Sequence, residues 1–285
     1  MPQGDLADRK NVCGSACGGV SGTNANYFRQ YVGFGGINLV EDEGNAHYHG
    51  LQASLRASNW KGLTLGAAYT WSHAWDVIDA QLFNNLTNPF SPRYSSGTSG
   101  FDRRHIAVVN FDYNLPIFQH SNGFAHKVLG GWALSGVVLM QTGNPLTINA
   151  GTNTLGLGGN ATSYADKVGT IKYPHTAAHW FDAVGAVAQP APLTWGNAPK
   201  AIGVGPGRDN WNTSLFKDFR FTEKSGVQLK FESFNTWNHT QFTGVNTGVL
   251  NGTPGTGANA YNGTQGAING VADPRVFQLG AKGYF

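Results

Sequence analysis

The histidines and acidic residues of this chain are the first candidates for chemistry, and their spacing suits metal binding only in part. His175 and His179 lie four residues apart in "HTAAH", which on a helix would let both hold one metal ion, but the Glu that follows the first His in zinc proteases is missing. His47 and His49 would share one face of a strand, where metal capture is the less favoured interpretation. The acidic run at 41–45 lacks the spacing of a calcium loop. Ordinary loop histidines and solvated loop charges explain these residues better.

Cys13 and Cys17 are the two cysteines of the chain, and they lie in a stretch rich in glycine and serine. A small disulfide in an exported loop is the preferred interpretation. The alternative is half of a metal site, for which no second Cys or His pair lies nearby. No G-x-S-x-G, phosphate-binding loop or dinucleotide-binding glycine pattern occurs. We therefore predict that the chain is not an enzyme and uses no cofactor.

The composition of the chain indicates its class better than these scattered residues do. Only 12% of the 285 residues are charged, whereas 40 are glycine and 12% are aromatic. No apolar run approaches the roughly 18 residues that a membrane-spanning helix needs. Few charges with many glycines and aromatics favour a transmembrane β-barrel, whose strands need only about 10 alternating residues. The net charge of +3 is too small to predict nucleic-acid binding.

Alternation of apolar and polar side chains recurs along the chain, as it does in strands with two different faces. The alternating segments are 48–57, 63–72, 107–115, 132–140, 211–221, 227–234 and 275–285. The connections are short at 58–62, 116–131 and 222–226 and long at 74–103, 143–210 and 235–274. Bacterial outer-membrane barrels have short periplasmic turns and long extracellular loops. The sequence therefore predicts an all-β fold, an antiparallel transmembrane β-barrel whose C-terminus is periplasmic.

Seven strands cannot close a bacterial barrel, which needs an even number. Residues 1–47 are interpreted as an extracellular loop or a poorly patterned N-terminal segment, whose glycines weaken an eighth strand. The first 19 residues also lack the apolar core of an export signal. We therefore expect residues 48–285 to be the C-terminal part of an outer-membrane β-barrel, partial, with about seven to eight strands of a larger barrel.

Four stretches of the chain are similar to the C-terminal half of TonB-dependent outer-membrane receptors. They are 44–76 ("GNAHYHGLQASLRASNWKGLTLGAAYTWSHAWD"), 205–221 ("GPGRDNWNTSLFKDFRF"), 234–242 ("FNTWNHTQF") and 275–285 ("RVFQLGAKGYF"). The likeness is greatest to the Oar-like group, whose members carry a carboxypeptidase-regulatory-like domain, and it covers roughly residues 27–285. It implies a barrel of about 22 strands with a plugged lumen, of which this chain would supply about the last third.

The resemblance implies uptake of a large or scarce nutrient across the cell outer membrane, such as a metal chelate, an oligosaccharide or a peptide. The implied partners are outer-membrane lipid, the barrel assembly machinery and the TonB system, the last only through N-terminal parts that these residues lack. Nucleic acid is not an expected partner. Two alternatives stay open: a small self-contained outer-membrane barrel that acts as an anchor or passive pore, and a secreted β-sandwich that binds carbohydrate.

The last strand resembles the signal that the barrel assembly machinery reads in this family. Phe285 matches the terminal aromatic residue, and Gln278 and Gly280 match the polar residue and the glycine upstream. Gly283 departs from the pattern, because an apolar side chain is usual there. The alternative is that Phe285 belongs only to the aromatic girdle at the membrane interface.

Six charged side chains share the polar parity of their strands and would line a wet lumen: Arg56, Asp112, Asp218, Arg220, Lys230 and Glu232. Mutual ion pairing is favoured for them over direct substrate contact. In the loops, Trp180, Phe181 and Trp195 are candidate ligand contacts that could stack on a sugar or siderophore ring. Anchoring of the loops is an equally good interpretation of these three aromatic residues.

Lys217 breaks the alternation, because it shares parity with Leu215 and Phe219 and would face lipid. A lysine at mid-membrane costs about 2–4 kcal/mol. Its long side chain could snorkel to the interface, or a bulge near Leu215 could shift the register of the strand. The sequence leaves both explanations open.

Overall fold

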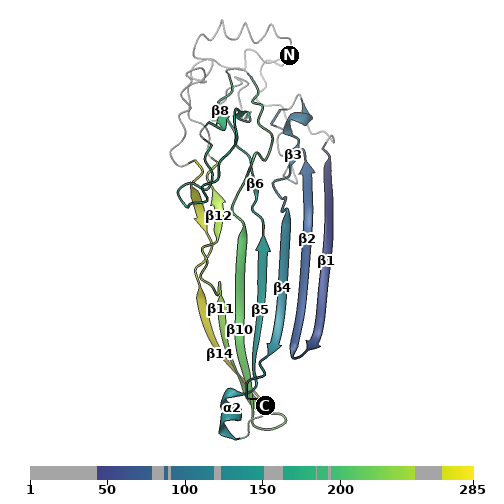
Figure 1. Cartoon of the computed structure of the whole chain (residues 1–285), viewed down its shortest axis with the longest axis vertical. Helices are drawn as coiled ribbons and strands as arrows, with labels where there is room; N and C mark the ends of the chain where they lie inside the picture. The colour runs from purple at the N-terminus through teal and green to yellow at the C-terminus, as the bar shows by residue number, and fades with distance from the viewer. Residues whose placement is uncertain are drawn as a thin grey trace, which may run out of the picture.

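Seven long strands form one sheet in the computed structural model, which describes residues 44–78, 87–88, 91–118, 123–150, 163–183, 185–191, 194–247 and 265–285. They are β1 (Ala46–Trp60), β2 (Leu63–Asp76), β4 (His105–Asn114), β5 (Trp132–Gln141), β10 (Arg208–Arg220), β11 (Gly226–Phe234) and β14 (Val276–Tyr284). Each pairs antiparallel with the next, so the sheet is an up-and-down meander (Figure 1). The predicted all-β, antiparallel fold is confirmed.

The pairing register sorts the side chains of the sheet onto two faces. On one face Leu65 lies opposite Phe111, and Phe111 lies opposite Gly136. A Cβ atom at Gly136 would come within 2.7 Å of the Phe111 ring, so the glycine leaves the space into which that ring extends. On the other face Asp112 lies opposite Ser135. We name these the apolar face and the polar face.

Short turns join the strands at one end of the sheet, which we name the turn end. Lys61 and Gly62 connect β1 to β2 with φ angles of 50° and 83°, and two positive φ angles are what a two-residue hairpin turn of this twist requires. Residues 221–225 connect β10 to β11, and the Phe221 N–H donates to the Ser225 carbonyl (3.0 Å). Both turns lie at the lower end of the sheet in Figure 1.

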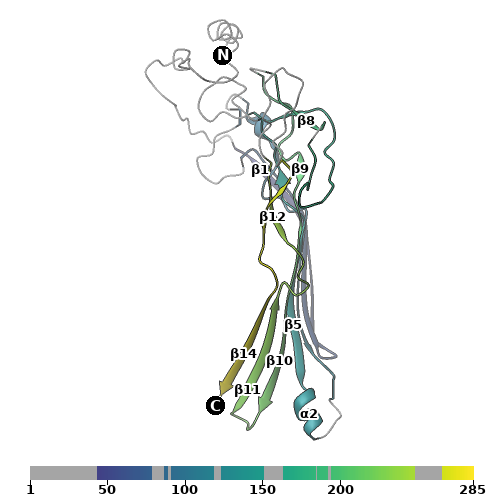
Figure 2. The ribbon, with the colours of Figure 1, turned by 90° about the vertical axis from the view of Figure 1, so that its left-hand side faces the viewer.

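The third short connection, between β4 and β5, contains a helix that the sequence did not predict. Helix α2 (Phe124–Leu129) is six residues long and lies at the turn end (Figures 1 and 2). The Leu115 N–H donates to the Trp132 carbonyl (2.9 Å) and closes the hairpin beside it. No helix in the described part of the chain is long and apolar enough to cross a membrane.

The long connections pack together at the opposite end of the sheet, the loop end, and form what we name the loop layer. Its elements are η3 (Pro92–Ser95), β3 (Gly97–Thr98), β6 (Pro145–Leu146), β7 (Asp166–Lys167), β8 (Val187–Ala188), β9 (Gly203–Val204), β12 (Phe242–Val245) and β13 (Ile268–Val271). β6 pairs with β9, β7 with β8 and β12 with β13, while β3 pairs with β2. Long and short connections therefore lie at opposite ends, as predicted.

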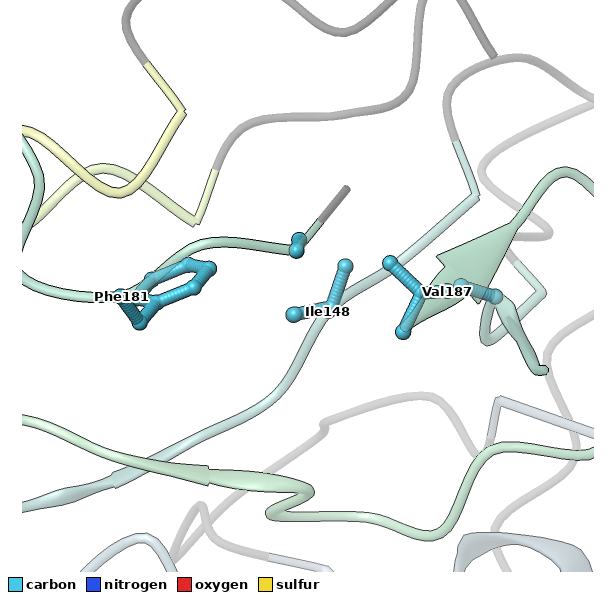
Figure 3. Close-up of a cluster of buried hydrophobic side chains, with 5 residues drawn as sticks. Ile148, Phe181 and Val187 are labelled. Carbon is cyan, nitrogen blue, oxygen red and sulfur yellow. The ribbon is translucent and has the colours of Figure 1, made fainter. Parts of the chain in front are cut away.

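The buried apolar cluster of the described residues lies in the loop layer and not in the sheet. We name it the loop core, and it consists of Ile148, Ala165, Phe181, Ala183 and Val187, each with 4% or less of its surface exposed (Figure 3). Val245, from the connection that follows β11, packs against it. Two long connections thus share one core.

The sheet is open among the described strands, because β1 pairs only with β2 and β14 only with β11. The described residues contribute seven long strands, which do not form a closed barrel. β1 extends from Ala46 to Trp60 and is longer at both ends than the alternation at 48–57 indicated. Its pairing with β2 shifts between Ala57 and Trp60.

Candidate functional site

All six predicted lumen residues lie on the polar face of the sheet. One polar row crosses six strands, and its successive partners are Thr64, Asp112, Ser135, Ser214, Glu232 and Gln278. Lys230 lies opposite Gly280, and Asp218 lies opposite Gln228. Arg56, Asp112, Asp218 and Arg220 are exposed, whereas Lys230 and Glu232 are half-buried. Because side chains alternate between the two faces of a strand, these six share one face of the sheet.

Neighbouring groups on the polar face bond to one another. The Lys230 ammonium lies 2.6 Å from the Glu232 carboxylate, two residues along the same strand. The Gln228 amide donates to the Asp218 carboxylate (3.1 Å) from the paired strand. The Lys230–Glu232 contact favours the ion-pairing interpretation for these two of the six charged side chains.

The apolar face carries aromatic side chains toward both of its ends. Toward the loop end are Tyr69, Trp71 and Trp211, and toward the turn end are Trp60, Tyr113, Trp132 and Phe219. Trp237, from the loop after β11, packs edge-on against Trp211 with ring centroids 6.1 Å apart.

The rows of the apolar face that lie between these aromatic residues are aliphatic, and in one such row Ala67, Val109 and Val138 lie side by side. Leu55, Trp71 and Phe231 are 62%, 48% and 39% exposed and Val138 is 2% exposed, so in the described part of the chain much of this face is uncovered.

Lys217 keeps the register of β10, which corrects the proposal of a bulge. It lies opposite Trp132 on one side and Leu229 on the other, and no pairing shift occurs around it. Its ammonium donates to the carbonyls of Lys127 (2.7 Å), Val128 (3.1 Å) and Gly130, at the C-terminal end of α2. The side chain is only 4% exposed. Lys217 thus belongs to the apolar face by parity but bonds to backbone carbonyls supplied by a helix.

The three candidate loop aromatics occupy different environments. Phe181 is 1% exposed in the loop core, a position that favours anchoring over ligand contact. Trp180 is half-buried, and its indole N–H donates to the Val204 carbonyl (3.1 Å). Trp195 packs edge-on against Tyr94 at 5.1 Å, and Tyr94 stacks on Tyr164 at 5.0 Å. Burial in this cluster raises the pKa of the Tyr94 hydroxyl.

Polar contacts that the sequence did not predict attach the loop layer to the loop end of the sheet. Lys200, from the longest loop, bonds to Asp76 at the end of β2, and the two residues are 6% and 7% exposed. Asp102 accepts a hydrogen bond from the Ala74 N–H (2.7 Å) and is 5% exposed. Lys200 and Asp76 are 124 residues apart. The alternation of apolar and polar residues could not predict such a pair, because alternation shows only which face of a strand a residue occupies.

The stretch at 234–242 builds a compact turn above β10 and β11. The buried side chain of Gln241 accepts from the Asp209 N–H (2.9 Å) and donates to the Asp209 carbonyl. Asn235, at φ 50°, donates to the His239 carbonyl and accepts from the His239 N–H, both at 3.0 Å. An open hollow of about 570 Å³ lies beside this turn, lined by Asp209, Trp237, Asn238, His239, Thr240 and Phe242.

The histidine pairs do not build a metal centre among the described residues, where no group of three His, Cys, Asp or Glu side chains could hold an ion. His175 and His179 lie in a turn and not on a helix, and the Thr176 N–H donates to the His179 carbonyl (3.1 Å). His49 lies opposite His73, and His47 lies opposite Trp75. Cys13, Cys17 and the acidic positions 41–43 fall outside the described residues.

The C-terminal strand β14 pairs with β11 along its full length. Gln278 lies opposite Glu232 and Gly280 opposite Lys230, both on the polar face. Gly283 lies opposite Val227 on the apolar face, where a Cβ atom would meet nothing within 4 Å. Phe285 follows the strand and is fully exposed. No contact in the described structure therefore constrains the last aromatic side chain.

Comparison with known proteins identifies one family. The family model described as "Outer membrane beta barrel domain" matches residues 5–278, which is nearly the whole chain. Searches of the curated proteins and of the solved structures gave no match.

Proposed function

The chain belongs to the outer membrane beta barrel domain family, and from that premise we propose that it forms part of the barrel of a TonB-dependent receptor. Such a receptor would take up a large or scarce nutrient, such as a metal chelate, an oligosaccharide or a peptide. Its location is the outer membrane. The apolar face then contacts lipid, the polar face lines the lumen, and the turn end is periplasmic.

The two aromatic zones fit the thickness of an outer membrane. From Trp211 to Phe219 the strand β10 makes eight residue steps, which is about 26 Å of chain at roughly 3.3 Å per residue. Strand tilt shortens this along the membrane normal, and the rings extend it again at both ends. The result is close to the roughly 25 Å apolar band of barrels of this class.

The open sheet is the observation that carries the proposal of a larger barrel. Among the described strands both β1 and β14 are edges, and a strand edge in lipid leaves backbone groups without hydrogen-bond partners at a cost of several kcal/mol each. Further strands must therefore pair with these edges in the membrane. A barrel of about 22 strands, as in the receptors with a plugged lumen, would contain these seven as about its last third.

The loop layer supports a role in nutrient capture. Its long connections share the loop core and are joined to the sheet by the Asp76–Lys200 pair, so the extracellular end is folded before a ligand arrives. Trp180, Trp195 and the hollow beside Trp237 offer aromatic surface next to polar groups, a combination that suits sugar or chelate rings. These residues are proposed as ligand contacts, with Phe181 as the anchor beneath them.

The partners follow from the same proposal. The barrel assembly machinery would read β14 through Gln278, Gly280 and Phe285, and the exposed Phe285 ring is free to be bound. The TonB system would act through the plug domain of such a receptor. No enzymatic activity and no nucleic-acid partner are proposed.

The size of the protein in native outer membranes tests the proposal. An antibody against residues 163–183 of the loop layer should detect a heat-modifiable protein of about three times the 30.4 kDa of this chain. Uptake of the nutrient should stop when the inner-membrane energy supply is collapsed. A folded protein of 30 kDa, with energy-independent leakage of small solutes, would instead establish the small passive barrel.

The secreted β-sandwich does not fit this fold. Its core would need a second sheet packed against the first, whereas the long strands described here form one sheet whose apolar face covers no second layer.

A further inference from the structure

We propose that helix α2 is a membrane foot, which means a short helix that rests in the membrane surface. It lies against the apolar, lipid-facing side of the sheet, which we also call the wall, at its periplasmic end. Its apolar side chains insert into the boundary between headgroups and acyl chains of the inner leaflet. We define the foot as residues 124–130. The inference depends on the outer-membrane location of the chain and not on transport.

The foot is attached to the apolar face by Lys217. This ammonium donates to the carbonyls of Lys127 (2.7 Å), Val128 (3.1 Å) and Gly130. The last carbonyls of a helix have no partner within the helix, and they carry its partial negative charge. A lysine that would be costly on a lipid-facing strand therefore finds acceptors for its protons and a favourable electrostatic environment.

Two strands hold the foot, because Trp132 contributes as well. The Trp132 indole N–H donates to the Val128 carbonyl (3.2 Å), the same carbonyl that Lys217 binds. The Lys217 ammonium also lies 4.8 Å from the centre of the Phe219 ring and 5.9 Å from that of Trp132. Since Lys217 comes from β10 and Trp132 from β5, the end of α2 is fixed to the lipid-facing side of the wall.

The foot exposes large apolar side chains. Phe124 is 81% exposed, Leu129 47% and Val128 38%. Phe124 and Val128 are four residues apart and share one side of the helix. Isolated helices of this length are not stable in water, so the contacts to the wall and to its surroundings must stabilise α2.

Phospholipid is the occupant that the surroundings favour. The foot is bonded to Lys217 and Trp132 of the apolar face, whose contact with lipid follows from the family. Lys127 is exposed on the same short helix, and a lysine side chain can reach a phosphate while its methylene groups stay near the acyl chains. This combination of bulky apolar groups and a cation is typical of helices that lie in the interface plane.

Depth-dependent quenching tests the foot. The full-length protein with Cys13 and Cys17 replaced by serine would carry Phe124→Cys labelled with an environment-sensitive fluorophore, in vesicles of phosphatidylcholine and phosphatidylglycerol. We expect quenching by lipids spin-labelled near the headgroup to exceed quenching by aqueous iodide at least about twofold. Lys224→Cys, in the exposed periplasmic turn after β10, is the matched control and should show the reverse order.

Two results would overturn the proposal. Iodide quenching at position 124 equal to that at 224 would place the helix in water, and protection from both quenchers would mean that a protein surface covers it. Lys217→Met tests the attachment: the barrel should stay heat-modifiable, while lipid quenching at position 124 falls about twofold or more. Unchanged quenching in Lys217→Met would show that the lysine does not hold the foot, whereas Lys224→Met should have no effect in any case.

Discussion

The sheet and the loop layer of this protein are stabilised in opposite ways. The described sheet has hydrogen-bonded rows from β1 to β14, but the buried apolar cluster lies outside it and most of its large apolar side chains are left for lipid. The loop layer has little regular structure, yet it contains the loop core and the buried Asp76–Lys200 pair. The comparison shows that the extracellular end resembles a small water-soluble domain placed on a membrane wall. Truncation of a buried apolar side chain should therefore destabilise the loop layer strongly. Introduction of a charged side chain should destabilise the sheet strongly.

Truncation of Phe181 should have the largest effect. Phe181→Ala removes a ring that is 1% exposed in the loop core, and such changes cost about 3–5 kcal/mol. The loop layer should lose protection from added protease and from amide exchange, while the barrel keeps its heat-modifiable mobility. If loop protection survives, the loop core is not what orders this layer.

Lys200→Met should destabilise the loop layer almost as much as Phe181→Ala. The substitution leaves the Asp76 carboxylate buried without its ammonium partner, which costs about 3–5 kcal/mol for a buried pair and less where water can enter. Amide exchange near Asp76 and the protease sensitivity of the longest loop should both rise. Replacing both residues, Lys200→Met with Asp76→Leu, should recover part of the loss, because no unpaired charge remains.

A lysine substitution should affect the stability of the barrel differently on the two faces of the sheet. Val109 and Asn110 are neighbours on β4, and Val109 lies on the apolar face while Asn110 lies on the polar face. Val109→Lys should destabilise the folded barrel by about 2–4 kcal/mol, and the water-exposed Asn110→Lys by no more than about 0.5 kcal/mol. Urea unfolding in lipid vesicles measures both. Equal effects would contradict the assignment of lipid to one face.

Glu232→Gln should have a small effect on stability. The Lys230–Glu232 pair is partly exposed, with the Lys230 side chain 41% exposed, so its loss should cost less than about 1 kcal/mol. The same urea unfolding applies. A larger loss would mean that the pair is shielded from water, for example by a plug in the lumen.

The pH dependence of the loop layer should give the smallest effect. Burial raises the pKa of Tyr94 above that of a free tyrosine, so the folded state disfavours the ionised phenol more than the unfolded chain does. The contribution of Tyr94 is present at neutral pH and declines as the pH rises above about 10. Protease protection of the loops should fall in that range, and Tyr94→Phe should remove this part of the decline.

Residues on strands were more predictable than residues in loops. The parity of Arg56, Asp112 and Lys230 follows from local alternation, so their common face was predictable. The environment of Phe181 was not, because its partners Ile148 and Val187 come from other parts of a long connection without periodicity. Helix α2 was also missed, since six residues are too few to show a helical period.

The sequence by itself determined the two faces of the wall, the up-and-down order of its strands and the ends at which short and long connections lie. These depend on a period of two residues and on connection length, which are local properties. Only the tertiary structure decided how Lys217 is accommodated and which loop residues form a core. Lys217 and its acceptors are 87 to 90 residues apart, and groups so distant meet only where the folded strands and turns bring them together.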